Sequence, residues 1–134
     1  MLKSKCILVY NLSEEEITKL KRINFKVLII EKNMSSMKIR DILNKKEATG
    51  EETSLPEEKV VLFNGYGQNE LRTTIRSVRN IVAGGFLAIV TPISINWTFE
   101  KLISHLMLEK ELNEAAKGEK NKWAELEKSL KKHV

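Results

Sequence analysis

Two matching stretches decide the fold of this chain: ILVYNLSEEEI at residues 7–17 and VLFNGYGQNEL at residues 61–71. They align without a gap, and each leads from an apolar run through a short turn into a segment with helical spacing. A second pair, MKIRDIL at 37–43 and WTFEKLI at 97–103, also aligns. The offset is 54 residues for the first pair and 60 for the second. The chain is therefore predicted to contain an internal repeat, whose second copy has six extra residues at Gly84–Gly85 or in its first helix.

Four short apolar runs predict the strands. They are CILVY (6–10), VLII (27–30), VVLF (60–63) and FLAIV (86–90). The runs show little alternation of polar residues, which is typical of strands buried on both faces of a parallel sheet. The segments between them have apolar residues at helical spacing, so each copy is predicted to be β-α-β-α. Strands joined through crossover helices lie parallel, and such crossovers are right-handed.

The predicted fold class is therefore α/β, a duplicated β-α-β-α. It has one four-stranded, mainly parallel sheet in the order 2-1-3-4, with helices on both faces and an extra C-terminal helix. An alternative is a sheet in which one copy pairs antiparallel to the other. The chain is predicted to be a single domain, 1–134, made of a first copy (1–43), an exposed linker (44–58), a second copy (59–117) and the extra helix (119–134).

Polar residues at the expected helix starts predict the helix caps. Glu16 follows Ser13 by three residues, as in a capping box. Ser36 and Asn96 hold matching positions in the two copies, and we expect them to cap the later helices. Their side chains can accept hydrogen bonds from the free amides of a first helical turn.

The composition is that of a soluble globular protein. Hydrophobic residues make up 42% of the chain and charged residues 31%, and the net charge is +5. The longest apolar run, at 81–90, is about half the length needed to span a bilayer. A single cysteine implies no oxidising compartment, and the first residues contain no signal-peptide core. These features predict a cytoplasmic protein.

The second copy resembles a known family. VVLFNGYGQNELRTTIRSVR followed by LAIVTPISINWTFEKLISHLMLEKE, within residues 59–112, is similar to the bacterial domain of unknown function 3783. The positions that match its helix-start pattern are Thr91, Pro92, Asn96, Trp97 and Thr98. The N-terminal copy lacks this pattern, with Glu31-Lys32 and Met37 in its place, and resembles the family only through the repeat. Because the family is uncharacterised, the resemblance implies no activity, cofactor or catalytic residue.

The stretch TPISINWT at 91–98 has two interpretations. In the structural one, Pro92 ends the fourth strand and Trp97 covers the end of the core. In the functional one, ligands bind beyond the carboxyl ends of parallel strands where the strand order reverses, near the loops at 11–13, 64–68 and 91–96. The candidate ligand-binding residues are Asn64, Gly65, Tyr66, Gly67, Gln68, Arg72, Thr91, Asn96 and Trp97.

The turn around Gly65 and Gly67 has the context of a phosphate site, because it follows a strand and opens a helix. The third glycine of the dinucleotide-binding pattern is replaced by Glu70, which would repel a pyrophosphate. Phosphate binding is therefore the less favoured interpretation, and Gly65 is expected to relieve a tight turn.

The sequence predicts no catalytic residue, metal or cofactor. Cys6, His105 and His133 lack the spacing of metal ligands, and we expect Cys6 to be a buried strand residue. The lone aspartate, Asp41, falls on a predicted helix. Glu31 at a strand exit is the best candidate for a general base, but its neighbour is a lysine and a solvated role is favoured.

Three arginines form a basic line along one predicted helix. Arg72, Arg76 and Arg79 lie one residue beyond its apolar stripe. Such a line can contact phosphates, but no aromatic residues interleave with it. Pairing with neighbouring glutamates is therefore expected, and nucleic-acid binding is disfavoured.

Two classes of function follow. The favoured one is a non-enzymatic binding or regulatory module that meets a protein partner or a second copy. Its contact surface would be the loop edge of the sheet or the C-terminal stripe of Trp123, Leu126 and Leu130. The alternative is a protein, or an enzyme, that binds a small molecule or anion at the loops around Gly65–Gln68. No membrane contact is predicted.

Overall fold

The computed structural model describes residues 5–48 and 55–113. The chain divides into two compact units, Met1–Ile103 and Ser104–Val134. The first unit contains the strands β1 (Cys6–Tyr10), β2 (Val27–Ile30), β3 (Val60–Asn64) and β4 (Phe86–Ile89) and the helices α1 (Glu14–Arg22), α2 (Ile39–Leu43) and α3 (Gln68–Arg79). A further helix is described over residues 99–113, of which 99–103 belong to the first unit and 104–113 to the second.

The four strands form one sheet in the order β2-β1-β3-β4, which confirms the predicted strand order. β1 pairs parallel with β2, and β3 pairs parallel with β4. The central pair, β1 with β3, is antiparallel. The prediction of a mainly parallel sheet is thus only partly right, and the antiparallel alternative describes how the two halves meet.

The pairing places matching residues of the two halves opposite each other. Leu8 and Leu62, which are 54 residues apart in the alignment of the halves, pair directly at the centre of the sheet. Outside the strands, Lys38 and Thr98 form an antiparallel bridge, and they match at the second offset of 60. These pairings are those expected if the two predicted copies are related by an approximate two-fold rotation through the middle of the sheet.

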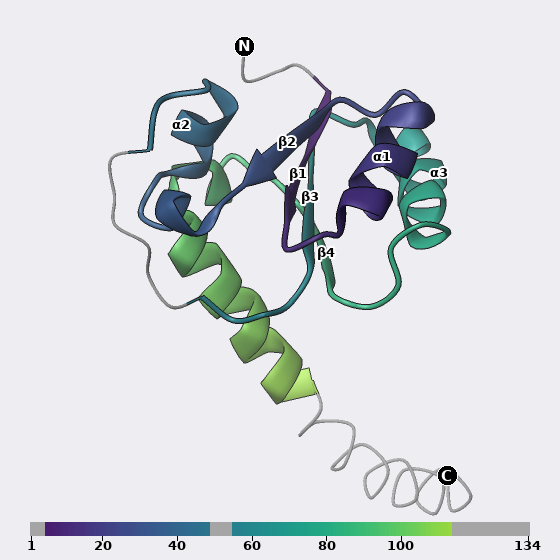
Figure 1. Cartoon of the computed structure of the whole chain (residues 1–134). Coiled ribbons are helices and arrows are strands. Elements are labelled where there is room, and N and C mark those ends of the chain that lie inside the picture. Colours follow the sequence, from purple (N-terminus) through teal and green to yellow (C-terminus); the bar gives the residue numbers. More distant parts are fainter. Residues whose placement is uncertain (1–4, 49–54, 114–134) are drawn as a thin grey trace, which may run out of the picture. The chain divides into compact units, whose positions relative to one another are not determined.

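Helices cover both faces of the sheet, as predicted. Figure 1 shows α1 and α3 on one face and α2 on the other. The core beneath α1 and α3 is formed by Ile7, Val9, Leu20, Val61, Phe63, Val78 and Val82. On the opposite face the Tyr10 ring lies 5.2 Å from that of Phe99, measured between centroids. Full burial of an aliphatic side chain such as Ile7 or Leu20 stabilises the fold by about 1.5–3 kcal/mol.

The capping box of α1 is present as predicted. The Glu16 amide donates to Ser13 Oγ at 3.1 Å, and the Ser13 amide donates to Glu16 Oε1 at 2.9 Å. Lys59 from the other half of the sheet pairs with Glu16 Oε2 at 3.0 Å. Burial alone would raise the pKa of Glu16, but the hydrogen bonds from Ser13 and Lys59 outweigh it, and the pKa is lowered.

The predicted caps of the later helices are wrong. The N-cap of α2 is Lys38 and not Ser36. In the second half a 3-10 turn (Ser94–Asn96) and the extended Trp97 precede the helix. The Thr98 hydroxyl then accepts a hydrogen bond from the Lys101 amide at 3.1 Å. The bridge between Lys38 and Thr98 holds both residues extended. Each helix therefore begins at the residue that follows its bridge residue.

The six extra residues of the second half lie between β3 and β4. α3 has 12 residues against 9 in α1, and the loop from Arg79 to Phe86 is longer than its counterpart. The linker is described only in part, and within it Leu55 is buried rather than exposed. The helix predicted at 119–134 lies outside the described residues. None of the helices within the described ranges is long and apolar enough to cross a membrane.

Candidate functional site

The antiparallel centre of the sheet separates the loops that were predicted to form one site. Cys6 pairs with Asn64 and Tyr10 pairs with Val60. The turn after β1, at residues 11–13, therefore lies at the opposite end of the sheet from the turn after β3. The prediction that these two turns converge on one ligand is wrong, because it assumed parallel central strands.

The turn after β3 contributes mainly to packing. Asn64 is buried, with its side-chain amide 4.0 Å from the sulfur of Cys6. The Tyr66 ring packs edge-on against Phe63 and Phe25, with centroids 6.1 and 6.5 Å away. Burial raises the pKa of the Tyr66 hydroxyl. Gly65 has a φ of 83°, so this turn favours glycine for its left-handed backbone, as expected.

The N-terminus of α3 already holds an anion from its own chain. The Gly67 amide donates to Glu70 Oε1 at 3.0 Å, and Lys5 pairs with Glu70 Oε2 at 2.7 Å. These hydrogen bonds from Lys5 and Gly67 lower the pKa of Glu70. A phosphate bound here would have to displace the carboxylate and compete with its charge. Anion binding at Gly65–Gln68 stays a prediction, and Glu70 opposes it.

The TPISINWT segment joins the two halves. Thr91 and Ser94 each accept a hydrogen bond from the other's amide, both at 2.9 Å. The Asn96 side chain donates to the Pro92 carbonyl at 3.4 Å. The Ile39 amide donates to the Trp97 carbonyl at 2.9 Å, which ties this segment to the first half.

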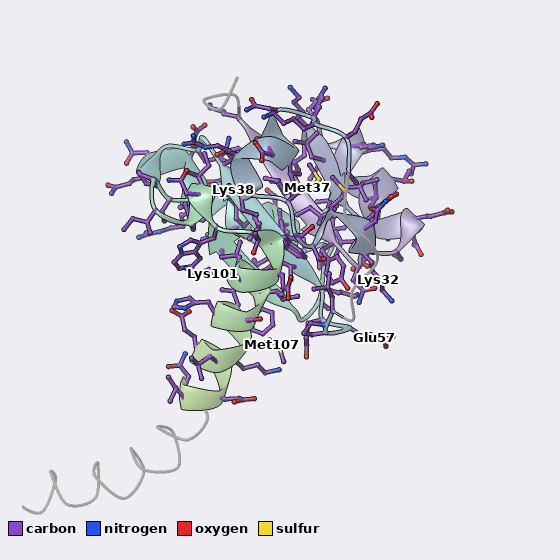
Figure 2. All side chains as sticks on the ribbon, turned by 90° about the vertical axis from the view of Figure 1, so that its left-hand side faces the viewer. Lys32, Met37, Lys38, Glu57, Lys101 and Met107 are labelled. Carbon is purple, nitrogen blue, oxygen red and sulfur yellow. The ribbon has the colours of Figure 1, made fainter. Side chains whose placement is uncertain are left out.

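Trp97 covers the core less than expected. Its matching residue in the first half, Met37, is buried, whereas Trp97 is only partly buried. The Lys101 ammonium lies 4.9 Å from the centre of the Trp97 ring, a cation–π distance. Figure 2 shows Met37, Lys38 and Lys101 on this side of the molecule. The side chain of Trp97 thus contacts Lys101 in the first turn of the helix that begins at residue 99.

The remaining candidate groups lie apart from one another. The Cys6 thiol is buried, which raises its pKa, so it is held as the unreactive thiol. His105, in the second unit, pairs with Glu109 at 3.0 Å. Residues 5–48 and 55–113 contain no group of three histidine, cysteine or acidic side chains arranged to hold a metal. His133, Trp123, Leu126 and Leu130 lie outside the described residues.

Among the described residues, no glutamate pairs with the basic line of α3. The Arg79 guanidinium donates to the carbonyls of Gly84 at 2.6 Å and of Val82 and Gly85 at 3.3 Å, closing the loop that leads to β4. Arg72 and Arg76 are exposed and have no acidic partner within the part of the chain that the structure describes. The expected pairing is therefore wrong for all three arginines.

A shallow depression of about 420 Å³ lies between α3 and β4. We call it the β4 groove; its lining residues are Gln68, Leu71, Arg72, Ile75 and Ile89. Gln68 and Arg72 were among the predicted site residues, but the three apolar ones were not. Ile89 is 49% exposed although it lies in a run that was predicted to be buried on both faces. The predicted strand order already made β4 an edge strand, and that signal could have identified Ile89.

The backbone of β4 is open beside this groove. The Phe86 amide donates to Lys59 and the Val90 amide donates to Phe63, at 2.7 and 2.9 Å. In a parallel ladder the bonding direction alternates along the strand. The N–H and C=O groups of Leu87 and Ile89 therefore point away from β3, toward the open edge of the sheet.

The opposite edge, at β2, has the same backbone arrangement. Ile29 of β2, which matches Ile89, is 46% exposed. The residue that matches Ile75 in α1 is Lys21, and the residue that matches Arg72 is Thr18. Ile75 and Arg72 are therefore features of the second half alone, whereas Leu71 is matched by Ile17.

These features define an α/β module with an open, apolar sheet edge. Within it, residues 59–112 match the model of a family described as domain of unknown function (DUF3783), which confirms the resemblance seen in the sequence. A search of the curated proteins found no match, and neither did a search of solved structures. The matched segment contains β3, α3 and β4, and thus the whole β4 groove. The match leaves residues 1–58 out, so the N-terminal copy stays a prediction.

Proposed function

We propose that this protein is a non-enzymatic interaction module that binds a partner protein at the open edge of β4. The observation that carries the proposal is the outward-facing backbone of Leu87 and Ile89 directly beside the apolar β4 groove. An exposed edge strand offers hydrogen bonds to a further strand, and a neighbouring pocket can select its side chains.

The sequence of β4 supports this proposal. Natural edge strands are usually protected from pairing by charged side chains, proline or a bulge. β4 is FLAI, without a charged residue, and Ile89 is about half exposed. An unprotected apolar edge of this kind favours association, so a specific partner would also protect the protein from aggregation.

In this proposal the two halves of the molecule have different roles. We infer that they arose by duplication, because their contacts occur in matching pairs: Lys5 with Glu70, and Lys59 with Glu16. Each glutamate accepts a hydrogen bond from the N-cap amide of its own helix, and both lysines come from the other half. In this proposal the first half supports the sheet and the second half binds.

Site-specific photo-crosslinking tests the proposal in the bacterial cytoplasm, where we expect the protein to act. A benzophenone amino acid is placed at position 89, or at position 29 as the matched control, in the full chain. The crosslinked protein and the crosslinked segment are then identified by mass spectrometry. We expect position 89 to join one segment of one protein repeatedly, and position 29 to give no such product.

A backbone variant makes the test specific for strand pairing. Leu87→Pro removes an outward-facing amide but none of the hydrogen bonds to β3, so it should reduce crosslinking at position 89. Val27→Pro removes the matching amide of β2 and serves as its control. The proposal would be rejected by equal products at positions 89 and 29, or by none at position 89.

A further inference from the structure

We infer that the partner segment is an extended, acidic stretch of another protein, which adds a fifth strand beside β4. This inference rests on the proposed function and specifies the chemistry of the partner. It combines three observations: the open backbone of β4, the apolar wall of the β4 groove, and two arginines of α3 that have no acidic partner among the described residues.

The backbone requires an extended partner. Leu87 and Ile89 each present one N–H and one C=O group at the open edge, and the intervening Ala88 bonds toward β3. Donors and acceptors at every second residue match the spacing of another β-strand. A helix satisfies its own backbone groups internally and would leave those of Leu87 and Ile89 unpaired.

The groove requires apolar side chains at alternate positions of the partner. Leu71 and Ile75 form its wall on α3, and Ile89 forms its floor on β4. Side chains of an added strand would point alternately toward this wall and away from it. Every second residue of the partner should therefore be apolar, to cover the exposed part of Ile89.

The charge beside the groove requires an acidic partner. Arg72 lines the groove, and Arg76 lies one helical turn further along α3. The glutamate of this helix, Glu70, is already paired with Lys5 and bonded to Gly67. Carboxylates on the partner could pair with both arginines at the edge of an apolar surface, where such pairs contribute most to specificity.

The same charges disfavour a second copy of this chain as the occupant. Two copies joined through β4 in a two-fold manner would place their α3 helices on the same side of a joint sheet. Arg72 and Arg76 of each copy would then approach those of the other, and like charges across an interface are costly. A nucleic acid is also disfavoured, because the groove wall is apolar and has no aromatic ring on which bases could stack.

A displayed library of random nine-residue peptides tests the inference. It is panned in parallel on the full-length protein and on two variants, Ile89→Asp and the matched control Ile29→Asp. We expect peptides that are enriched on the wild type and on Ile29→Asp but lost on Ile89→Asp. Their sequences should alternate apolar residues with positions rich in aspartate and glutamate.

The charge requirement is measured on the most enriched peptide, synthesised with a fluorescent label. Replacing both Arg72 and Arg76 by alanine should weaken its binding about tenfold or more, the effect of losing close charge pairs at an interface. Arg22→Ala, at the position of α1 that matches Arg76, should leave binding unchanged. Circular dichroism of each variant confirms that it remains folded.

The outcomes separate this inference from the proposed function. Enriched peptides that depend on Ile89 but are neutral or basic would overturn the acidic partner and leave the interaction module intact. The absence of any peptide lost on Ile89→Asp would overturn both. A single-stranded RNA probe that bound in a strongly salt-dependent way, lost with the arginines but not with Ile89→Asp, would also overturn the inference.

Discussion

Gly85 shows how one residue fixes the path of the chain into β4. Its φ is +73°, and a Cβ atom placed on it would lie 2.4 Å from the carbonyl oxygen of Lys59. That same oxygen accepts the first hydrogen bond of β4, from Phe86, at 2.7 Å. The close approach of the two strands therefore excludes any side chain at position 85.

Gly85→Ala should consequently destabilise the protein by about 2–3 kcal/mol, because it combines a steric clash with an unfavourable backbone conformation. Gly84→Ala is the matched control, with φ of +72° but no atom within 4 Å of the added Cβ. It should cost only about 1 kcal/mol. Urea denaturation of both variants gives the two values, and equal losses would contradict the packing at Lys59.

At the scale of elements, the sequence predicts the strands well and their directions poorly. The predicted runs at 6–10 and 27–30 coincide with β1 and β2, although only β1 is buried along its whole length. A strand buried on both faces has the same pattern in either direction, and a linker as long as 44–58 can reach either end of the sheet. The antiparallel centre could therefore be stated only as an alternative.

Helix starts were predicted only where the contacts are local. The α1 box joins Ser13 and Glu16, three residues apart, and was found from the sequence. The starts of α2 and of the helix at residue 99 depend on the bridge between Lys38 and Thr98. Sixty residues separate these two positions, so their local sequence does not reveal the contact.

The buried capping box of α1 predicts how stability depends on pH. The Glu16 side chain is 12% exposed, and its pKa is lowered below the ordinary value of 4.5 in the folded state. The ionised form therefore stabilises the fold above pH 4.5, and this contribution is lost as the pH falls through the lowered pKa.

Glu16→Gln should accordingly reduce the free energy of unfolding at pH 7. The difference in the free energy of unfolding between this variant and the wild type should shrink progressively as the pH is lowered below 4.5. Glu15→Gln, whose side chain is 77% exposed in its pair with Lys19, is the control and should change little at either pH. A Glu16→Gln effect that did not vary with pH would show that the carboxylate charge contributes nothing.

At the scale of the whole molecule, two similar halves share one sheet but differ in what their edges present. The sequence predicted a repeat and a strand order, and the strand order is confirmed. It placed the candidate site at the strand-end loops, because it assumed that the first and third strands run in the same direction. Residues such as Tyr66 and Asn64 were then selected for positions that serve packing.

The β4 groove could not be predicted from any local pattern. It depends on which strand lies at the edge of the sheet and on how α3 packs across that strand. Leu71, Ile75 and Ile89 are apolar, like core residues. Only the three-dimensional arrangement leaves their side chains partly exposed. The family match adds no activity that would have indicated this surface.

Amide hydrogen exchange, followed residue by residue on the full-length protein, tests the open edge most directly. In the protein alone, the amides of Leu87 and Ile89 should exchange quickly, whereas those of Phe86 and Val90, which bond to β3, should exchange slowly. A bound partner segment should slow the exchange of Leu87 and Ile89 and leave Val27 and Ile29 unchanged. The account would be contradicted if Leu87 and Ile89 were already as slow as Phe86 and Val90 without a partner, since the edge would then be covered by the chain itself.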